Sequence, residues 1–148
     1  MANKTTSNAR TKRHLEALGW HCEIVERFNP YAGKFGQRKD LFGFLDIIAI
    51  DKDNDRIIGI QACGTDFTPH KRKMLTEATP DIRAIAIDWL KAGAGIQLWG
   101  WRKVLAKKGG KQKTWQPRIE EYTIEDYAAV AAQAERQGNN ETLSNQTD

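Results

Sequence analysis

The sequence predicts an α/β protein with a central mixed sheet flanked by helices, in the order α-β-β-β-α-α-β-β-α. Two short apolar runs rich in β-branched residues, 41–50 and 56–63, surround a linker of Asp and Asn, which is typical of two antiparallel strands and a tight turn. A helical stretch then leads to a further apolar run at 96–104, and a crossover of this kind favours parallel pairing.

The elements before the central pair of strands are a helix, a strand and a loop. Residues 5–18 carry a modest apolar face among charged side chains, and Gly19 ends the predicted helix. Residues 20–28 alternate loosely between apolar and polar side chains, as a strand does. Residues 29–36 contain proline and glycine and predict a loop, after which the charged segment 37–40 leads into the central strand.

The elements after the central pair are indicated by capping residues and turn signals. Thr68 followed by Pro69 predicts one helix start, and Thr79 followed by Pro80 predicts a second helix that includes 82–91. The remaining expectations are strands at 96–104 and 114–122 around a hairpin tip at 106–113, with Pro117 marking an edge strand, a helix from a Thr123 cap to about Arg136, and a disordered polar tail at 138–148. We therefore expect one domain, residues 1–137.

The net charge of +4 conceals a basic body and an acidic end. Residues 1–122 contain 22 Lys and Arg against 14 Asp and Glu, whereas residues 123–148 contain 1 against 5. A basic body is the electrostatic footprint of polyanion binding, most often of nucleic acid.

No apolar run reaches the length of a membrane span, and the first residues lack the apolar segment of a signal peptide. Cys22 and Cys63 do not make a disulfide framework, and their spacing to the histidines fits no common zinc pattern. We therefore expect a cytoplasmic protein with free thiols.

Asp46 is the one charged residue in the apolar run 41–50. An ionised carboxylate costs several kcal/mol to bury unless something compensates it. Asp46 therefore predicts a site with a metal ion, a cation or several donors nearby. The alternative is an Asp that is hydrogen-bonded at a strand end or bulge beside Gly43.

The register of the two central strands predicts a partner for Asp46. If Asp53 and Asn54 are the central turn residues, the residue numbers of each cross-strand pair sum to 107. Asp46 then lies opposite Gln61. A three-residue turn would instead place it opposite Ala62. With the first register, the two polar side chains inside these strands converge on one face of the sheet.

Asp40 lies six residues before Asp46 and shares its face if the strand is continuous. It is then either a second acidic ligand at the mouth of the site or a partner for Arg38 or Lys39.

This order of elements, with Gly43-Phe-Leu-Asp46 on one strand and Gln61-Ala-Cys63 on the next, resembles the PD-(D/E)XK nuclease superfamily. It looks closest to the small phage-encoded and Holliday-junction-resolvase-like members, over roughly residues 8–104. The resemblance implies a restriction-endonuclease-like fold that hydrolyses DNA with Mg²⁺ or Mn²⁺. It implies that Asp46, Gln61 and the Ala62 carbonyl hold the metal, and Glu16 would match the helical Glu of some members.

The lysine position of that superfamily is occupied here by Cys63. A thiol offers no fixed cation to a phosphate and is a poor ligand for Mg²⁺. Some members supply the lysine from elsewhere, so the resemblance points to Lys71 and Lys73 in the following helix, with Lys39 behind them. The alternative is that these lysines form a solvated basic helix face.

Two groups of basic residues are candidates for binding nucleic acid. A flexible basic hairpin is suited to following a phosphate backbone, although lysines on an edge strand also block aggregation. The candidate residues are Arg38, Lys39, Lys71, Arg72, Lys73, Lys107, Lys108, Lys111 and Lys113.

These features predict divalent-metal-dependent hydrolysis of DNA phosphodiesters, of nuclease or resolvase type. The alternative is a catalytically degenerate nuclease-fold protein that binds nucleic acid or an acidic protein partner without cleavage. A third class is a phage-type accessory or inhibitor protein on the same scaffold. DNA is the expected partner, and the resemblance to resolvases raises the expectation of a homodimer.

Overall fold

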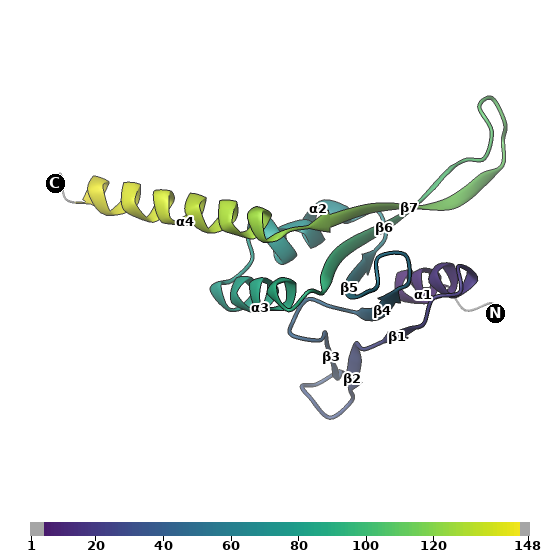
Figure 1. Cartoon of the computed structure of the whole chain (residues 1–148), viewed down its shortest axis with the longest axis horizontal. Coiled ribbons are helices and arrows are strands. Elements are labelled where there is room, and N and C mark those ends of the chain that lie inside the picture. The colour runs from purple at the N-terminus through teal and green to yellow at the C-terminus, as the bar shows by residue number, and fades with distance from the viewer. Residues whose placement is uncertain (1–4, 146–148) are drawn as a thin grey trace.

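The computed structural model describes residues 5–145 and has an α/β fold built on a five-stranded mixed sheet (Figure 1). The strands follow the order β1-β4-β5-β6-β7, and β2 pairs with β3 in a separate hairpin. The strands are β1 (Cys22–Ile24), β2 (Arg27–Asn29), β3 (Gln37–Lys39), β4 (Ile47–Asp51), β5 (Arg56–Cys63), β6 (Gly95–Leu105) and β7 (Lys113–Tyr122). The helices are α1 (Ser7–Ala17), α2 (Phe67–Lys71), the π-helical turn η1 (Arg72–Thr76), α3 (Pro80–Lys91) and α4 (Ile124–Asn145).

The pairing of β4 with β5 confirms the predicted register. The strands are antiparallel, and Ile47 pairs with Ile60 while Asp51 pairs with Arg56, so each pair of positions sums to 107. The Asp51 carboxylate organises the turn by accepting hydrogen bonds from the amides of Asp53 and Asn54. β5 and β6 are parallel, as the helical crossover predicts, and β7 lies at the sheet edge.

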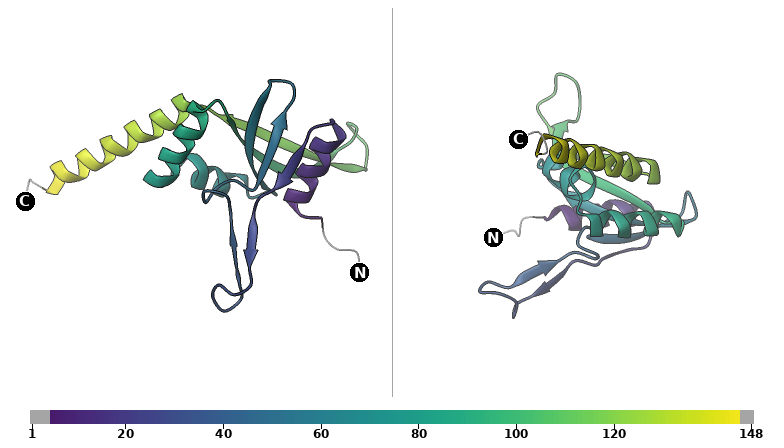
Figure 2. Two further views of the ribbon diagram at one scale, coloured as in Figure 1. Left: turned by 60° about the horizontal axis from the view of Figure 1, so that its bottom comes forward. Right: turned by 90° about the vertical axis from the view of Figure 1, so that its left-hand side faces the viewer.

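Helices cover both faces of the sheet (Figures 1 and 2). On one face, Leu15 of α1 packs on a cluster that includes Ile60 and Trp101, and Thr11 Oγ1 accepts a hydrogen bond from Trp101 Nε1 at 2.8 Å. On the other face, α2, η1, α3 and α4 bury the second core, whose members include Phe67, Met74, Leu75, Ala86, Leu98 and Tyr127.

The predicted strand at 41–50 is wrong in its first half. Leu41 and Leu45 form an isolated bridge around a tight turn in which Phe42 and Gly43 have positive φ angles of 56° and 84°. After the turn, Leu45 packs over Gly59, where a Cβ atom would lie 2.6 Å from Leu45 Cδ1. Regular pairing therefore begins at Ile47.

The segment 20–39 also differs from expectation. The predicted strand at 20–28 is divided into β1 and β2, and the predicted loop at 29–36 is the tip of the β2–β3 hairpin. The element order consequently has two more strands than the sequence predicts. The hairpin projects from the body of the protein (Figure 2).

The helices differ from the predictions mainly at their ends. Thr79 caps α3 as expected, and Thr123 and Asp126 form reciprocal cap hydrogen bonds at α4. The helix after β5 starts at Phe67, with Asp66 in place of Thr68 at the N-cap position. α4 continues to Asn145 through most of the segment predicted to be disordered, and residues 146–148 of that prediction lie outside the described residues. No helix within 5–145 has both the length and the apolar character needed to cross a membrane.

Candidate active site

Three carboxylates meet beside the start of β4. Glu26, Asp40 and Asp46 each offer an oxygen that lies within 4.8 Å of the other two. Asp46 is 6% exposed, and the side chains of Asp40 and Glu26 are 14% and 18% exposed. We call this group the carboxylate cluster.

Each carboxylate is positioned by a different backbone feature. Asp46 joins the sheet because its amide donates to the Ile60 carbonyl at 2.9 Å. Its own carbonyl accepts from the amides of Val25 and Glu26, which brings Glu26 beside it at the end of β1. Asp40 returns to the same place through the tight turn between Leu41 and Leu45, whose hydrogen-bonded backbone brings residue 40 back toward residue 46.

The Asp46 carboxyl group is held in its protonated form at neutral pH. Burial raises its pKa to about 8, and the hydrogen bond to Asp40 together with the negative charge of Asp40 acts in the same direction. A hydrogen bond of 3.3 Å from the Ala62 amide to Asp46 Oδ2 lowers the pKa and only partly offsets these effects. Carboxylates this close cannot all ionise unless a cation lies among them.

Gln61 lies beside the carboxylate cluster. Its side chain is 2% exposed, and its Nε2 atom donates to Asp40 Oδ2 at 3.4 Å. Among the described residues, its Oε1 atom is buried with no hydrogen-bond partner. A buried carbonyl oxygen without a partner costs about 1–3 kcal/mol, which a cation ligand would recover. Carboxylate and amide oxygens suit Mg²⁺, Mn²⁺ or Ca²⁺, so the residues fit the divalent cation that the resemblance implies.

Lys73 brings a positive charge to this cluster and Lys71 does not. Lys73 Nζ lies 3.0 Å from Asp40 Oδ2, whereas Lys71 Nζ pairs with Glu120 Oε1 on β7 at 2.9 Å. Lys73 belongs to the π-helical turn η1, a distortion that recurs at functional sites. Of the two lysines proposed from the sequence, the structure therefore brings only Lys73 to the carboxylates.

The structure does not bring Glu16 into the carboxylate cluster. Glu16 is exposed on α1, and its carboxylate pairs with Lys12 at 3.8 Å. Glu26 lies in the cluster instead, and the sequence analysis missed it. The signal for Glu26 is weak, since it follows one short strand and meets Asp46 only through the β1–β4 pairing.

Ala62 and Cys63 follow Gln61 on β5. The Ala62 backbone adjoins the cluster through its amide hydrogen bond to Asp46. Cys63 is 3% exposed in the second core, and burial raises the pKa of its thiol, with the charges of Asp66 and Asp46 adding to the effect. The side chain at the family's lysine position is thus a neutral core thiol, which packs and carries no charge.

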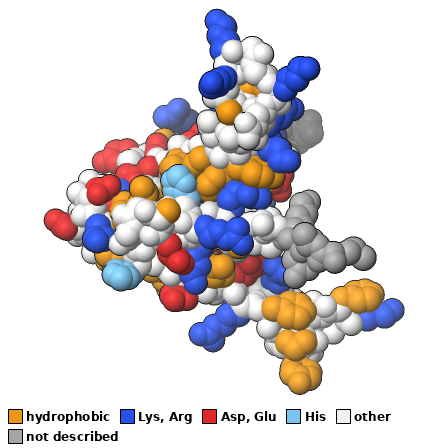
Figure 3. Space-filling view, turned by 90° about the vertical axis from the view of Figure 1, so that its right-hand side faces the viewer, with side chains coloured by type: hydrophobic (Ala, Val, Ile, Leu, Met, Phe, Trp, Pro, Cys, Tyr) orange, Lys and Arg blue, Asp and Glu red, His pale blue; other side chains and the backbone are white. Residues whose placement is uncertain are grey.

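The other basic candidates are exposed and lie on two projecting arms and on η1. Arg38 and Lys39 lie on β3, and Arg38 Nη1 is 3.9 Å from Glu26 Oε2. The β6–β7 hairpin tip forms the upper arm in Figure 3, with blue side chains at its end. Within the described part of the chain, none of its four candidates forms an ion pair: Lys107, Lys108, Lys111 and Lys113.

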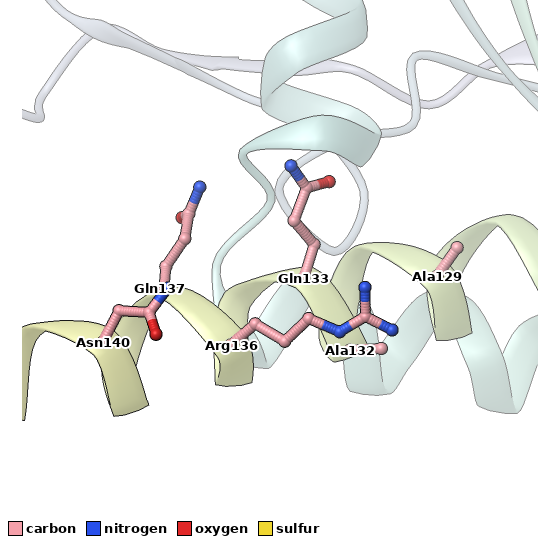
Figure 4. A pocket seen from close by; sticks show the side chains of 6 residues that line it. All are labelled: Ala129, Ala132, Gln133, Arg136, Gln137 and Asn140. Atoms are coloured by element: carbon pink, nitrogen blue, oxygen red, sulfur yellow. The ribbon is translucent and has the colours of Figure 1, made fainter. Parts of the chain in front are cut away.

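A groove of about 770 Å³ runs past Asp40 between the base of the β2–β3 hairpin and α3. Ile24, Phe42 and Ile85 give it apolar walls, and Arg27 and Lys39 give it positive charge. Asp40 is the member of the carboxylate cluster that lines this groove. A second hollow of about 460 Å³ is lined by α4 alone, with no carboxylate among its residues (Figure 4).

No family model matches the chain, and no curated protein or solved structure is significantly similar to it.

Proposed function

We propose that this protein is a divalent-metal-dependent nuclease that hydrolyses DNA phosphodiesters, on a restriction-endonuclease-like variant of the α/β fold. One observation carries the proposal: three carboxylates lie within 4.8 Å of one another, beside a buried amide oxygen that has no partner among the described residues. When ionised, the three carboxylates carry a charge of −3, which Lys73 on Asp40 and Arg38 beside Glu26 offset only in part. The remaining negative charge favours a cation.

In this proposal, Asp46, Asp40, Glu26 and the Oε1 atom of Gln61 hold the cation. A divalent ion bound there would activate a water molecule and stabilise charge on the phosphate. Binding of the cation would require Asp46 to lose its proton, because a metal ligand of this kind must be deprotonated.

Lys73 takes the role that Cys63 cannot take. Its ammonium group lies on the rim, 48% exposed, and is already aimed at the carboxylate cluster. A fixed cation at this place stabilises the negative charge that develops on the phosphate oxygens in the transition state. Neutralising Asp40 by a cation would free Lys73 to interact with the phosphate.

The test is hydrolysis of plasmid and branched DNA with Mg²⁺ or Mn²⁺ by the wild type and by Asp46→Ala and Asp40→Asn. We expect cleavage by the wild type alone, with DNA binding retained in both variants. Asp53→Asn is the matched control, because Asp53 is an exposed acid in the β4–β5 turn. Cleavage by the Asp46→Ala variant at the wild-type rate would refute the proposal.

A second candidate function is nucleic-acid binding without cleavage. The neutral Gln61 and the buried thiol of Cys63 favour it, since neither supplies the charge that an active site of this kind uses. DNA binding by the wild type with no cleavage under any divalent cation is the outcome that selects this function.

A further inference from the structure

The β2–β3 hairpin is an arm with an unusual surface. It is a two-stranded element separate from the main sheet, held by the pairs Arg27–Lys39, Phe28–Arg38 and Asn29–Gln37. Both views in Figure 2 show it projecting from the body. A two-stranded hairpin has no core of its own and is marginally stable alone, so its composition reflects what its surface contacts.

Three aromatic rings on this arm face solvent. Tyr31 is 94% exposed, Phe35 is 86% exposed and Phe28 is 58% exposed. Figure 3 shows the apolar side chains gathered on the lower arm. Phe28 lies across Gly36, where a Cβ atom would come within 2.5 Å of its ring, so this ring also supports the hairpin. Tyr31 and Phe35 have no such structural role.

The same arm is strongly positive. Residues 27–39 contain Arg27, Lys34, Arg38 and Lys39 and no acidic residue. Aromatic rings interleaved with cations are the pattern that binds single-stranded nucleic acid, where bases stack on rings and cations contact phosphates. Two such arms packed against each other would bring eight like charges together, which disfavours a second copy of this chain as the partner.

The arm is also joined directly to the carboxylate cluster. Glu26 immediately precedes β2 and Asp40 immediately follows β3, so both roots of the hairpin are cluster residues. Arg27 and Lys39 at the base line the groove that runs past Asp40. A nucleic-acid strand that binds along the arm would therefore have its phosphate backbone directed toward the carboxylate cluster.

We propose that the β2–β3 hairpin binds DNA with unpaired bases, which stack on Tyr31 and Phe35 while Arg27, Lys34 and Arg38 contact the phosphates. This inference rests on the proposed function in one respect: the bound strand brings a phosphodiester to Asp40, where the proposed nuclease would cleave it. Unpaired DNA is favoured over duplex because a duplex hides the faces of its bases in its own stack, whereas single strands and open junctions present them.

The experiment measures fluorescence anisotropy of three labelled probes: a single strand, the duplex of the same sequence and a four-way junction with an unpaired centre. Full-length Asp46→Asn protein is used without divalent cations, so that binding is separated from cleavage. Adding Tyr31→Ala and Phe35→Ala should weaken single-strand and junction binding about tenfold or more, and duplex binding far less. Leu18→Ala with Ile57→Ala, two similarly apolar exposed positions outside the arm, is the control and should change none of the three.

A second readout comes from Tyr31→Trp, which places an exposed indole at the tip. Because the chain has five other tryptophans, the emission of the protein with Tyr31 is subtracted at each DNA concentration. The difference should be quenched by the single strand and unchanged by the duplex. Equal loss of affinity for all three probes in the Tyr31→Ala/Phe35→Ala protein would overturn the proposal. Unchanged affinity of the Tyr31→Ala/Phe35→Ala protein for all three DNA probes would also overturn it. Loss of self-association in sedimentation, or of binding to anionic vesicles, would then identify the other role of the arm. The binding experiment contains no divalent cation, so its result does not depend on cleavage. If the wild type has no nuclease activity but still prefers single-strand and junction probes to the duplex, the proposed function is refuted and the inference about the hairpin stands.

Discussion

Asp46 and Asp51 lie at the two ends of β4, and both are buried, but their carboxyl groups are stabilised in opposite protonation states. Burial opposes ionisation of Asp51, yet hydrogen bonds from Asn54 and Arg56 outweigh it and lower its pKa. Burial and the neighbouring Asp40 raise the pKa of Asp46 to about 8. The fold therefore stabilises the ionised form of Asp51 and the protonated form of Asp46.

The first prediction concerns stability against pH in the absence of divalent cations. A raised carboxyl pKa means that the folded state loses stability as pH rises between the unfolded value near 4 and about 8. Asp46→Asn should remove this loss and stabilise the protein at pH 8 by up to about 5 kcal/mol, with little effect at pH 4.

Asp51→Asn is the matched variant, and its effect on stability should depend on pH in the opposite direction. A lowered pKa contributes stability that is present above the unfolded pKa and is lost as pH falls through the folded value. This variant should lose about 1–3 kcal/mol at neutral pH. Urea denaturation of both variants and the wild type from pH 2 to 8 checks the pair. The same dependence on pH in both variants would contradict the opposite pKa shifts.

The second prediction concerns cation binding. Because a divalent cation must displace the proton on Asp46, its affinity should rise about tenfold per pH unit up to about pH 8. Thermal unfolding with Mg²⁺ or Mn²⁺ should therefore show a larger rise in Tm at pH 8 than at pH 5.5. Asp40→Asn should abolish this rise and Asp53→Asn should retain it. A Tm that increases equally at both pH values would indicate binding elsewhere.

The third prediction separates the two lysines. Lys73→Ala should lower the cleavage rate about 10²- to 10³-fold with a smaller effect on DNA affinity, because Lys73 faces the carboxylate cluster. Lys71→Ala should leave the rate near that of the wild type, because Lys71 is paired with Glu120 on β7. Single-turnover cleavage checks both, and Lys73→Arg should recover part of the rate. The reverse ranking of the two alanine variants would reassign the catalytic cation.

The fourth prediction concerns the β6–β7 hairpin. If its tip follows the phosphate backbone, replacing Lys107, Lys108, Lys111 and Lys113 by Ala should weaken binding to every DNA probe alike. The slope of log affinity against log salt should become shallower by about 3–4. Neutralising Arg13, Lys52, Lys91 and Arg136, four exposed cations elsewhere, is the control. An unchanged slope in the hairpin variant would indicate that these lysines only protect the sheet edge.

The convergence of Asp46 and Gln61 was predictable because it depends on a short-range rule. The Asp- and Asn-rich turn sets the β4–β5 register, and the period of two then fixes which side chains share a face. The caps at Thr79 and Thr123 were predictable for the same reason, since each involves residues within three positions of one another.

The features that were missed or wrongly explained depend on long-range packing. Asp40 was expected beside Asp46, but it arrives there through a tight turn and not along a continuous strand, and in this turn Leu45 packs over Gly59 of β5. Glu26 enters the cluster through β1–β4 pairing, which local sequence does not specify. The hairpin tip resembles an ordinary Pro- and Gly-containing loop, and only its projection from the body reveals the exposed rings.

The separation of root from tip in the β2–β3 hairpin has a consequence for how such a protein diversifies. The three registered pairs between residues 27 and 39 separate Glu26 and Asp40 from the hairpin tip at positions 30–36. Under the proposed function, exchanges at the exposed tip positions should change substrate preference and leave the carboxylate cluster in place, whereas Gly36 is held by the ring of Phe28. Recognition and reactivity would then be adjustable independently.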